Sequence, residues 1–224
     1  MNYLAHGWRF TDDPYFLAGA AVPDWLCVAD RRARVRSKRA AEWVDDLVAE
    51  TAAVARGICQ HHADDRWFHQ SRAFVELSLD FSRRTRDALP ADEGFRPWFL
   101  GHILVELLLD AALVEQQPER LTAYYAALAE IDGKLVEAAV NRIALQPTQR
   151  LHEFISLFCS ERFLYDYSDD GKLLVRLNQV MRRVRLPALP EFFIELLPAM
   201  RAAVRLQRFE LLAGGPIAAT IVKA

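Results

Sequence analysis

Glycine and cysteine are scarce in this sequence, and each scarcity excludes a class of protein. Only 9 of the 224 residues are glycine, and they form neither a glycine-rich phosphate-binding loop nor a Gly-x-Ser-x-Gly nucleophile elbow. The 3 cysteines, Cys27, Cys59 and Cys159, are odd in number and widely spaced. This spacing indicates free thiols in a reducing compartment rather than a disulfide framework.

Long hydrophobic runs and a strong net charge are also lacking. The longest apolar run, Ile103 to Leu109, is interrupted by Glu106, and the first residues lack the basic-then-apolar order of a signal peptide. The formal net charge of -2 gives no overall field that would attract nucleic acid or a membrane. These features predict a cytoplasmic protein with no transmembrane segment and no nucleic-acid partner.

Helical periodicity is what the sequence does contain. Phe74, Leu77 and Phe81 recur at i, i+3 and i+7, and no run alternates in the manner of a strand. No repeat or linker divides the chain, so we expect an all-α fold with a single domain over residues 1–224. The helical segments expected are 2–10, 15–21, 40–56, 61–69, 71–89, 98–115, 118–130, 134–145, 151–165, 173–184 and 192–212.

Two of these segments carry histidine and acidic residues at helical spacing. His61, Asp65 and His69 stand at i, i+4 and i+8, so on one helix they would share a face. His102, Glu106 and Asp110 repeat that spacing in a segment that is otherwise almost wholly apolar. Buried carboxylates require cations, and imidazole with carboxylate is a ligand set for zinc, iron or manganese.

Two further residues could complete a metal site. His6 and Asp24 each lie in an apolar stretch near the N-terminus. The alternative is that His6 is a hydrogen-bonded core histidine, that Asp24 caps a helix, and that the other pairs are ordinary i, i+4 contacts. We expect His62 and Asp64, which lie off the shared face, to be solvated.

A basic segment follows the second apolar stretch. It holds six cations in nine residues: Arg31, Arg32, Arg34, Arg36, Lys38 and Arg39. Such a run is either a solvated, mobile connection or a docking surface for an anionic partner. Aromatic residues are not interleaved with it, which disfavours single-stranded nucleic acid.

Several short motifs together resemble one known family. They are Met1-Asn2-Tyr3-Leu4-Ala5-His6, Gly19 with Pro23-Asp24, Gly57-Ile58 with His61 and Asp65, Glu106 with Asp110, and residues 163–167 with 178–187. These segments resemble the acyl carrier protein phosphodiesterase family, whose members have a helical HD-like hydrolase fold. His62, His69, Glu106 and Ala111 depart from that family's pattern. His61-x3-Asp65 with His102-x3-Glu106 is also similar to the ligand pattern of zinc-dependent phospholipase C proteins.

Both resemblances imply a helical bundle that hydrolyses phosphodiesters with one or two divalent ions (manganese, zinc or iron). The implied ligands are His6, Asp24, His61, Asp65, His69, His102, Glu106 and Asp110, with Asp65 or Asp110 as general base. The basic segment would then hold an acyl carrier protein while the phosphopantetheine arm of that carrier reaches the metal. The alternatives are a phospholipase C-like or small-molecule phosphodiesterase, and a non-catalytic helical binding module.

Overall fold

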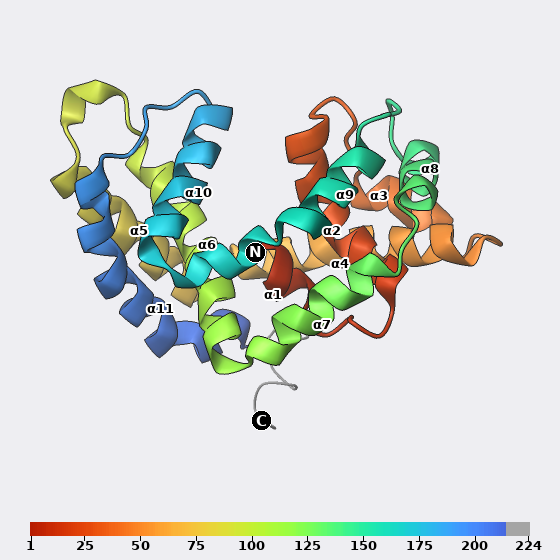
Figure 1. The fold of residues 1–224 in the computed structure, drawn as a ribbon, viewed down its shortest axis with the longest axis horizontal. Helices are drawn as coiled ribbons and strands as arrows, with labels where there is room; N and C mark the ends of the chain where they lie inside the picture. Colours follow the sequence, from red (N-terminus) through yellow and green to blue (C-terminus); the bar gives the residue numbers. More distant parts are fainter. Residues whose placement is uncertain (214–224) are drawn as a thin grey trace. The chain divides into compact units, whose positions relative to one another are not determined.

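The computed structural model describes residues 1–213 and contains only helices and their connections over that range, which confirms the all-α prediction (Figure 1). The α-helices are α1 (Tyr3–Gly7), α2 (Pro14–Ala29), α3 (Ser37–Ala40), α4 (Ala49–Phe68), α5 (Arg72–Ala88), α6 (Pro97–Gln116), α7 (Pro118–Ala129), α8 (Gly133–Ile143), α9 (Leu151–Glu161), α10 (Asp170–Arg183) and α11 (Leu197–Leu212). Four 3-10 segments accompany them: η1 (Ala41–Trp43), η2 (Ala91–Glu93), η3 (Phe163–Ser168) and η4 (Glu191–Leu196).

The chain divides into two compact units, each made of two stretches of sequence. Unit 1 consists of Met1–Trp67 and Glu119–Arg162, and unit 2 of Phe68–Pro118 and the chain from Phe163 onward. No change of composition marks these boundaries in the sequence. The expected single domain over residues 1–224 stays a prediction.

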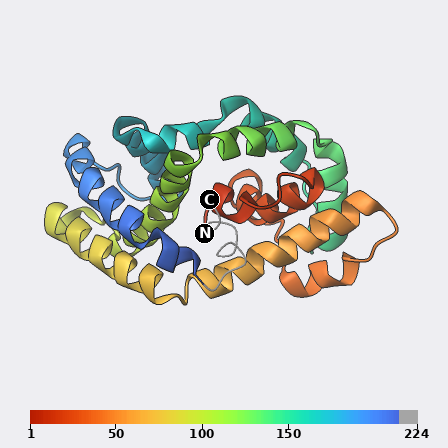
Figure 2. The same cartoon turned by 90° about the horizontal axis from the view of Figure 1, so that it is seen from below.

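In unit 1, two glycines allow helices α2 and α4 to pack backbone against backbone (Figure 2). A Cβ at Gly19 would overlap the backbone of Val54, and a Cβ at Gly57 would overlap the carbonyl of Phe16. This close approach brings the carbonyl oxygen of Ala20, on α2, against α4. The position of α4 relative to α2 therefore depends on the absence of side chains at two residues.

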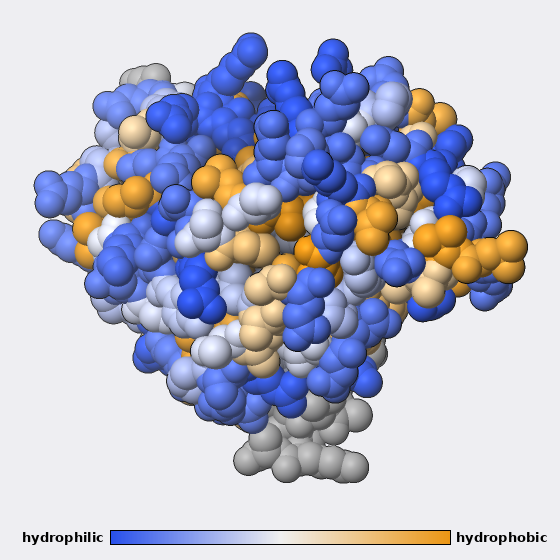
Figure 3. Space-filling view, turned by 45° about the vertical axis from the view of Figure 1, so that its right-hand side comes forward, coloured by the Kyte–Doolittle hydropathy of each residue, from blue (hydrophilic) through white to orange (hydrophobic). Residues whose placement is uncertain are grey.

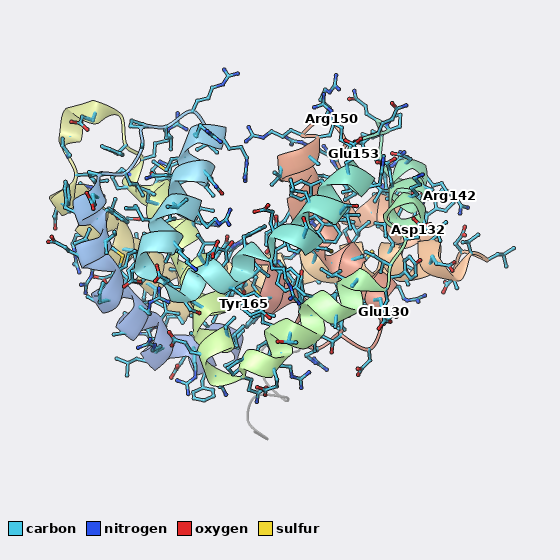
Figure 4. All side chains as sticks on the ribbon, viewed as in Figure 1. Glu130, Asp132, Arg142, Arg150, Glu153 and Tyr165 are labelled. Atoms are coloured by element: carbon cyan, nitrogen blue, oxygen red, sulfur yellow. The ribbon has the colours of Figure 1, made fainter. Side chains whose placement is uncertain are left out.

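Helix α8 of unit 1 carries an N-terminal cap and an arginine contact (Asp132 and Arg142 are labelled in Figure 4). Asp132 caps α8 by accepting a hydrogen bond from Lys134 N at 2.8 Å. Arg142, near the end of the same helix, pairs with Asp46 at 2.7 Å and lies 4.3 Å from the ring centre of Trp43. These contacts connect α8 to the segment that precedes α4.

In unit 2, α5 and α11 both pack beside α6 (Figure 1). Phe74, Leu77 and Phe81, the apolar positions expected on α5, are all buried. Arg201 of α11 is also buried, where it donates to Asp170 at 2.6 Å and to the Tyr167 carbonyl oxygen at 2.9 Å. These contacts surround α6, which carries three of the residues singled out in the sequence.

Helix α6 is long and apolar enough to cross a membrane by length and composition alone, but 67% of its most apolar window is buried inside the protein. Buried core helices of soluble proteins pass the same test. On the face drawn in Figure 3, apolar side chains are scattered among hydrophilic ones.

The helix boundaries differ from those expected in several places, and two of the differences concern α2 and α4. Helix α2 continues through Pro23 to Ala29, so Asp24 lies inside a helix and the alternative that it caps one is wrong. Helix α4 runs unbroken from Ala49 to Phe68, whereas a break was expected near Gly57. In both cases tertiary packing outweighs the local preference against helix, which is about 1 kcal/mol for glycine and about 3 kcal/mol for proline.

Candidate metal centre

Three of the expected ligands come together in unit 1. His6 lies on α1, and His61 and Asp65 lie one turn apart on α4. One atom from each lies within 4.8 Å of the others, and we call this group the unit 1 triad. The i, i+4 spacing on α4 aligns two of the ligands, and the packing of α1 supplies the third.

The ring of His61 is oriented by the backbone of α2. Its Nδ1 lies 2.8 Å from the carbonyl oxygen of Ala20. A carbonyl oxygen only accepts hydrogen bonds, so Nδ1 carries the proton and donates it. In the neutral ring Nε2 then presents a lone pair, and this atom lies 3.3 Å from Asp65 Oδ2.

The ring of His6 is oriented in the same way by a carboxylate. His6 Nδ1 lies 3.3 Å from Oδ2 of Asp64, a buried residue that also accepts a 2.7 Å hydrogen bond from Gln60. His6 Nε2 is buried, and its contact within the triad is Asp65 Oδ1, 3.3 Å away. A histidine whose second nitrogen is held by a carboxylate is the arrangement that supports many metal ligands.

These distances fit a metal ion. Ligand bonds of about 2.0–2.1 Å around a tetrahedral zinc ion place neighbouring ligand atoms about 3.3 Å apart. Both imidazole Nε2 atoms lie at that distance from Asp65 oxygens. The two rings are also stacked, with centroids 4.0 Å apart, so protonating both would place like charges face to face. The donor set therefore suits one shared cation better than two protons.

The electrostatics of the triad keep its carboxylate ionised. Burial alone would raise the pKa of Asp65, but contacts with His6 and His61 and with the Met1 amino group, 2.7 Å away, hold that pKa well below its usual range. Burial would lower the pKa of His61, but the negative charges of Asp24 and Asp65 outweigh it and raise that pKa. Asp24, half-buried on α2, thus acts on the triad electrostatically.

The basic segment is held against α4 beside the triad. His62 Nε2 lies 3.0 Å from the Val35 carbonyl oxygen, and Arg39 Nε donates to the Ile143 carbonyl oxygen at 2.6 Å. Ala33 and Val35 are buried. The other five cations of the segment are exposed: Arg31, Arg32, Arg34, Arg36 and Lys38. The segment is therefore not a solvated connection throughout.

The other expected ligands lie in unit 2. His69 Nε2 is 2.8 Å and His102 Nε2 is 3.2 Å from the same oxygen, Glu106 Oε1. We call these three residues the unit 2 triad. Hydrogen bonds from the two imidazoles are among the causes that lower the pKa of Glu106, although burial, the largest influence, would raise it. Asp110, one turn further along α6, has no exposed surface.

Two parts of the site were missed in the sequence. Asp64 was expected to be solvated but is buried and orients His6, and His62 is half-buried on the basic segment. The Ala20 carbonyl that orients His61 is a backbone atom without a sequence signal. The only clue to it was the pair of glycines, Gly19 and Gly57, that lets α2 approach α4.

No family model, curated protein or solved structure matches this chain.

Proposed function

We propose that this protein is a metal-dependent phosphodiester hydrolase whose metal site is the unit 1 triad, His6, His61 and Asp65. One observation carries the proposal: His6 Nε2 and His61 Nε2, from two different helices, each lie 3.3 Å from an oxygen of Asp65. This is the spacing of neighbouring ligand atoms around one tetrahedral ion. The resemblance to acyl carrier protein phosphodiesterases connects this site with phosphodiester chemistry.

Each residue of the site has a separate task. His6 and His61 would hold a manganese, zinc or iron ion through Nε2, while Asp64 and the Ala20 carbonyl keep the rings in place. A divalent ion there would lower the pKa of a water molecule toward neutrality and polarise a phosphoryl oxygen. Asp24 would add negative charge to the same site.

Of the two carboxylates expected as general base, Asp65 is the more accessible. Its side chain is 30% exposed, whereas Asp110 is fully buried in unit 2. The lowered pKa of Asp65 keeps it ionised at neutral pH, as a metal ligand must be. The same lowering makes it a weak base, so we assign Asp65 to the metal rather than to proton transfer.

The test of this function is hydrolysis of holo-acyl carrier protein. We expect protein supplied with manganese or zinc to release phosphopantetheine and leave the apo carrier, both identified by mass spectrometry, and a chelator to stop the release. Faster cleavage of a phospholipid or a chromogenic diester than of the carrier would support the alternative phosphodiesterases. Stable, folded protein that cleaves none of these substrates would leave the non-catalytic helical module as the better account.

The basic segment gives a second, independent prediction. Arg36 and Lys38 are exposed and make no ion pair within residues 1–213. Reversing both charges (Arg36→Glu with Lys38→Glu) is expected to lower kcat/KM for the carrier protein about 10- to 100-fold relative to a small diester, because complementary charge steers association. Steady-state kinetics at low and high salt measure the change, which salt should diminish.

A matched control is available in unit 2. Arg86 and Arg182 are likewise exposed, so Arg86→Glu with Arg182→Glu makes the same change of charge in the other unit. The docking role of the basic segment is wrong if the two double variants lose carrier activity equally.

A further inference from the structure

The unit 2 triad has the composition of a metal site in its own right. We propose that His69, His102 and Glu106 bind a second divalent transition-metal ion, zinc in particular, independently of the unit 1 triad. This inference does not rest on the proposed hydrolase function, because none of its residues belongs to that site.

The geometry of the triad converges on one point. His69 Nε2 and His102 Nε2 lie 2.8 Å and 3.2 Å from the same oxygen of Glu106, and the two ring centroids are 4.6 Å apart. All three ligand atoms lie within 4.8 Å of one another. Two imidazole nitrogens and one carboxylate oxygen form the ligand set of many catalytic zinc sites and of non-haem iron sites.

Two different segments supply these ligands. His102 and Glu106 are one turn apart on α6, so the helix itself aligns them. His69 lies in the turn that follows α4. Helix α6 fixes the spacing of two ligands, and another segment supplies the third. The three ligands would therefore occupy one side of the coordination sphere.

Buried aromatic residues hold both imidazoles in position. The Phe74 ring centre lies 4.9 Å from that of His69 and 5.0 Å from that of His102. Phe68 lies 5.5 Å from His69 on the same wall, and both phenylalanines are buried. Rings packed in this way lose little freedom when an ion binds, and their apolar neighbours strengthen the attraction between ion and ligands.

The other side of the triad is open to water. The side chains of His69 and His102 are 31% and 38% exposed, whereas that of Glu106 is 12% exposed. An ion held by three protein ligands would keep coordination positions on the exposed side for water or a substrate. The two nitrogens favour zinc, cobalt or iron over magnesium and calcium, which prefer oxygen ligands.

The chain contains a natural comparison for this triad. In unit 1, His152 Nδ1 lies 3.0 Å from Glu137 Oε2, with side chains 30% and 14% exposed. This pair matches His69 and Glu106 in distance and exposure but lacks a second imidazole. Zinc binding that depends on His69 and His102 and not on His152 would separate a metal site from an ordinary histidine–glutamate pair.

The experiment uses the full chain with the unit 1 triad disabled. In His61→Ala protein, titration calorimetry with zinc is expected to show one bound ion, and cobalt is expected to give visible absorption bands. Adding His102→Gln or His69→Gln should weaken zinc binding at least 10- to 100-fold, whereas adding His152→Gln should not change it. Magnesium should not compete with zinc.

Folding and the two proposals are tested separately. Thermal unfolding checks every variant, and Asp65→Asn serves as the background if His61→Ala does not fold. The inference is overturned if the disabled protein binds no zinc, or if His69→Gln and His102→Gln bind it as tightly as their parent. Zinc that persists at this triad in a protein without phosphodiesterase activity would contradict the proposed function and leave this site standing.

Discussion

His61→Ala protein is expected to lose the ion of the unit 1 triad and to hydrolyse the carrier protein about a thousandfold more slowly. The ion would stabilise the transition state by several kcal/mol, and this stabilisation is lost with the ion. Each 1.36 kcal/mol that is lost slows the reaction about tenfold. Metal analysis of the purified protein and kcat measurements in the presence of added manganese or zinc test the two parts. The metal content should fall by one ion and not to zero, because the unit 2 triad is unchanged.

The same variant also affects stability, so a milder change accompanies it. Removing His61 leaves the Ala20 carbonyl without its donor, which costs about 1–3 kcal/mol. Asp65→Asn keeps the shape of the site and removes only its charge. His152→Ala is the matched control, since His152 also pairs with a carboxylate. Full activity and unchanged metal content in both His61→Ala and Asp65→Asn protein would contradict the assignment of this triad as the metal site.

Gly57→Ala is expected to destabilise the protein by more than about 3 kcal/mol, although alanine favours helix over glycine by about 1 kcal/mol. The added methyl would overlap the carbonyl oxygen of Phe16 and lie 2.7 Å from Ala20 N. Helices α2 and α4 would have to separate, and the contact between His61 and Ala20 would lengthen. Thermal unfolding should show a midpoint lower by about 10 °C, with weaker metal binding.

Gly133→Ala provides the comparison within the same unit. A Cβ at Gly133, in the first turn of α8, would meet its neighbours at 3.4 Å or more, which is ordinary van der Waals contact. This variant should be as stable as the parent or slightly more so. Equal stability of Gly57→Ala and Gly133→Ala would show that α2 and α4 do not need the close approach.

The sequence predicted the helices where local pattern and packing agree. Phe74, Leu77 and Phe81 marked α5 because the buried face of an amphipathic helix repeats every three to four residues. The sequence did not predict the helix boundaries that depend on packing between helices. Gly57 indicated a break by propensity, but its role is to admit the backbone of α2, and a distant helix is invisible to local pattern.

The candidate site was likewise predictable only where spacing along one helix positions its residues. Spacing of i, i+4 correctly joined His61 to Asp65 and His102 to Glu106, because both pairs lie on one helix. It also placed His69 on the face of Asp65, whereas α4 ends at Phe68 and His69 contacts Glu106. The groups that orient the ligands, such as the Asp64 carboxylate, act through tertiary contacts and gave no signal.

The interleaving of the two units along the sequence affects how the chain would acquire the proposed metal site during synthesis. His6, His61 and Asp65 all lie in the first 65 residues, but unit 1 is completed only by Glu119–Arg162. A growing chain on the ribosome therefore carries all three ligands long before the second part of their unit has been made. Because the whole of Phe68–Pro118 is translated in between, unit 1 cannot complete its fold until Arg162 has been synthesised, whereas an N-terminal domain of contiguous sequence could fold as soon as its own residues had emerged.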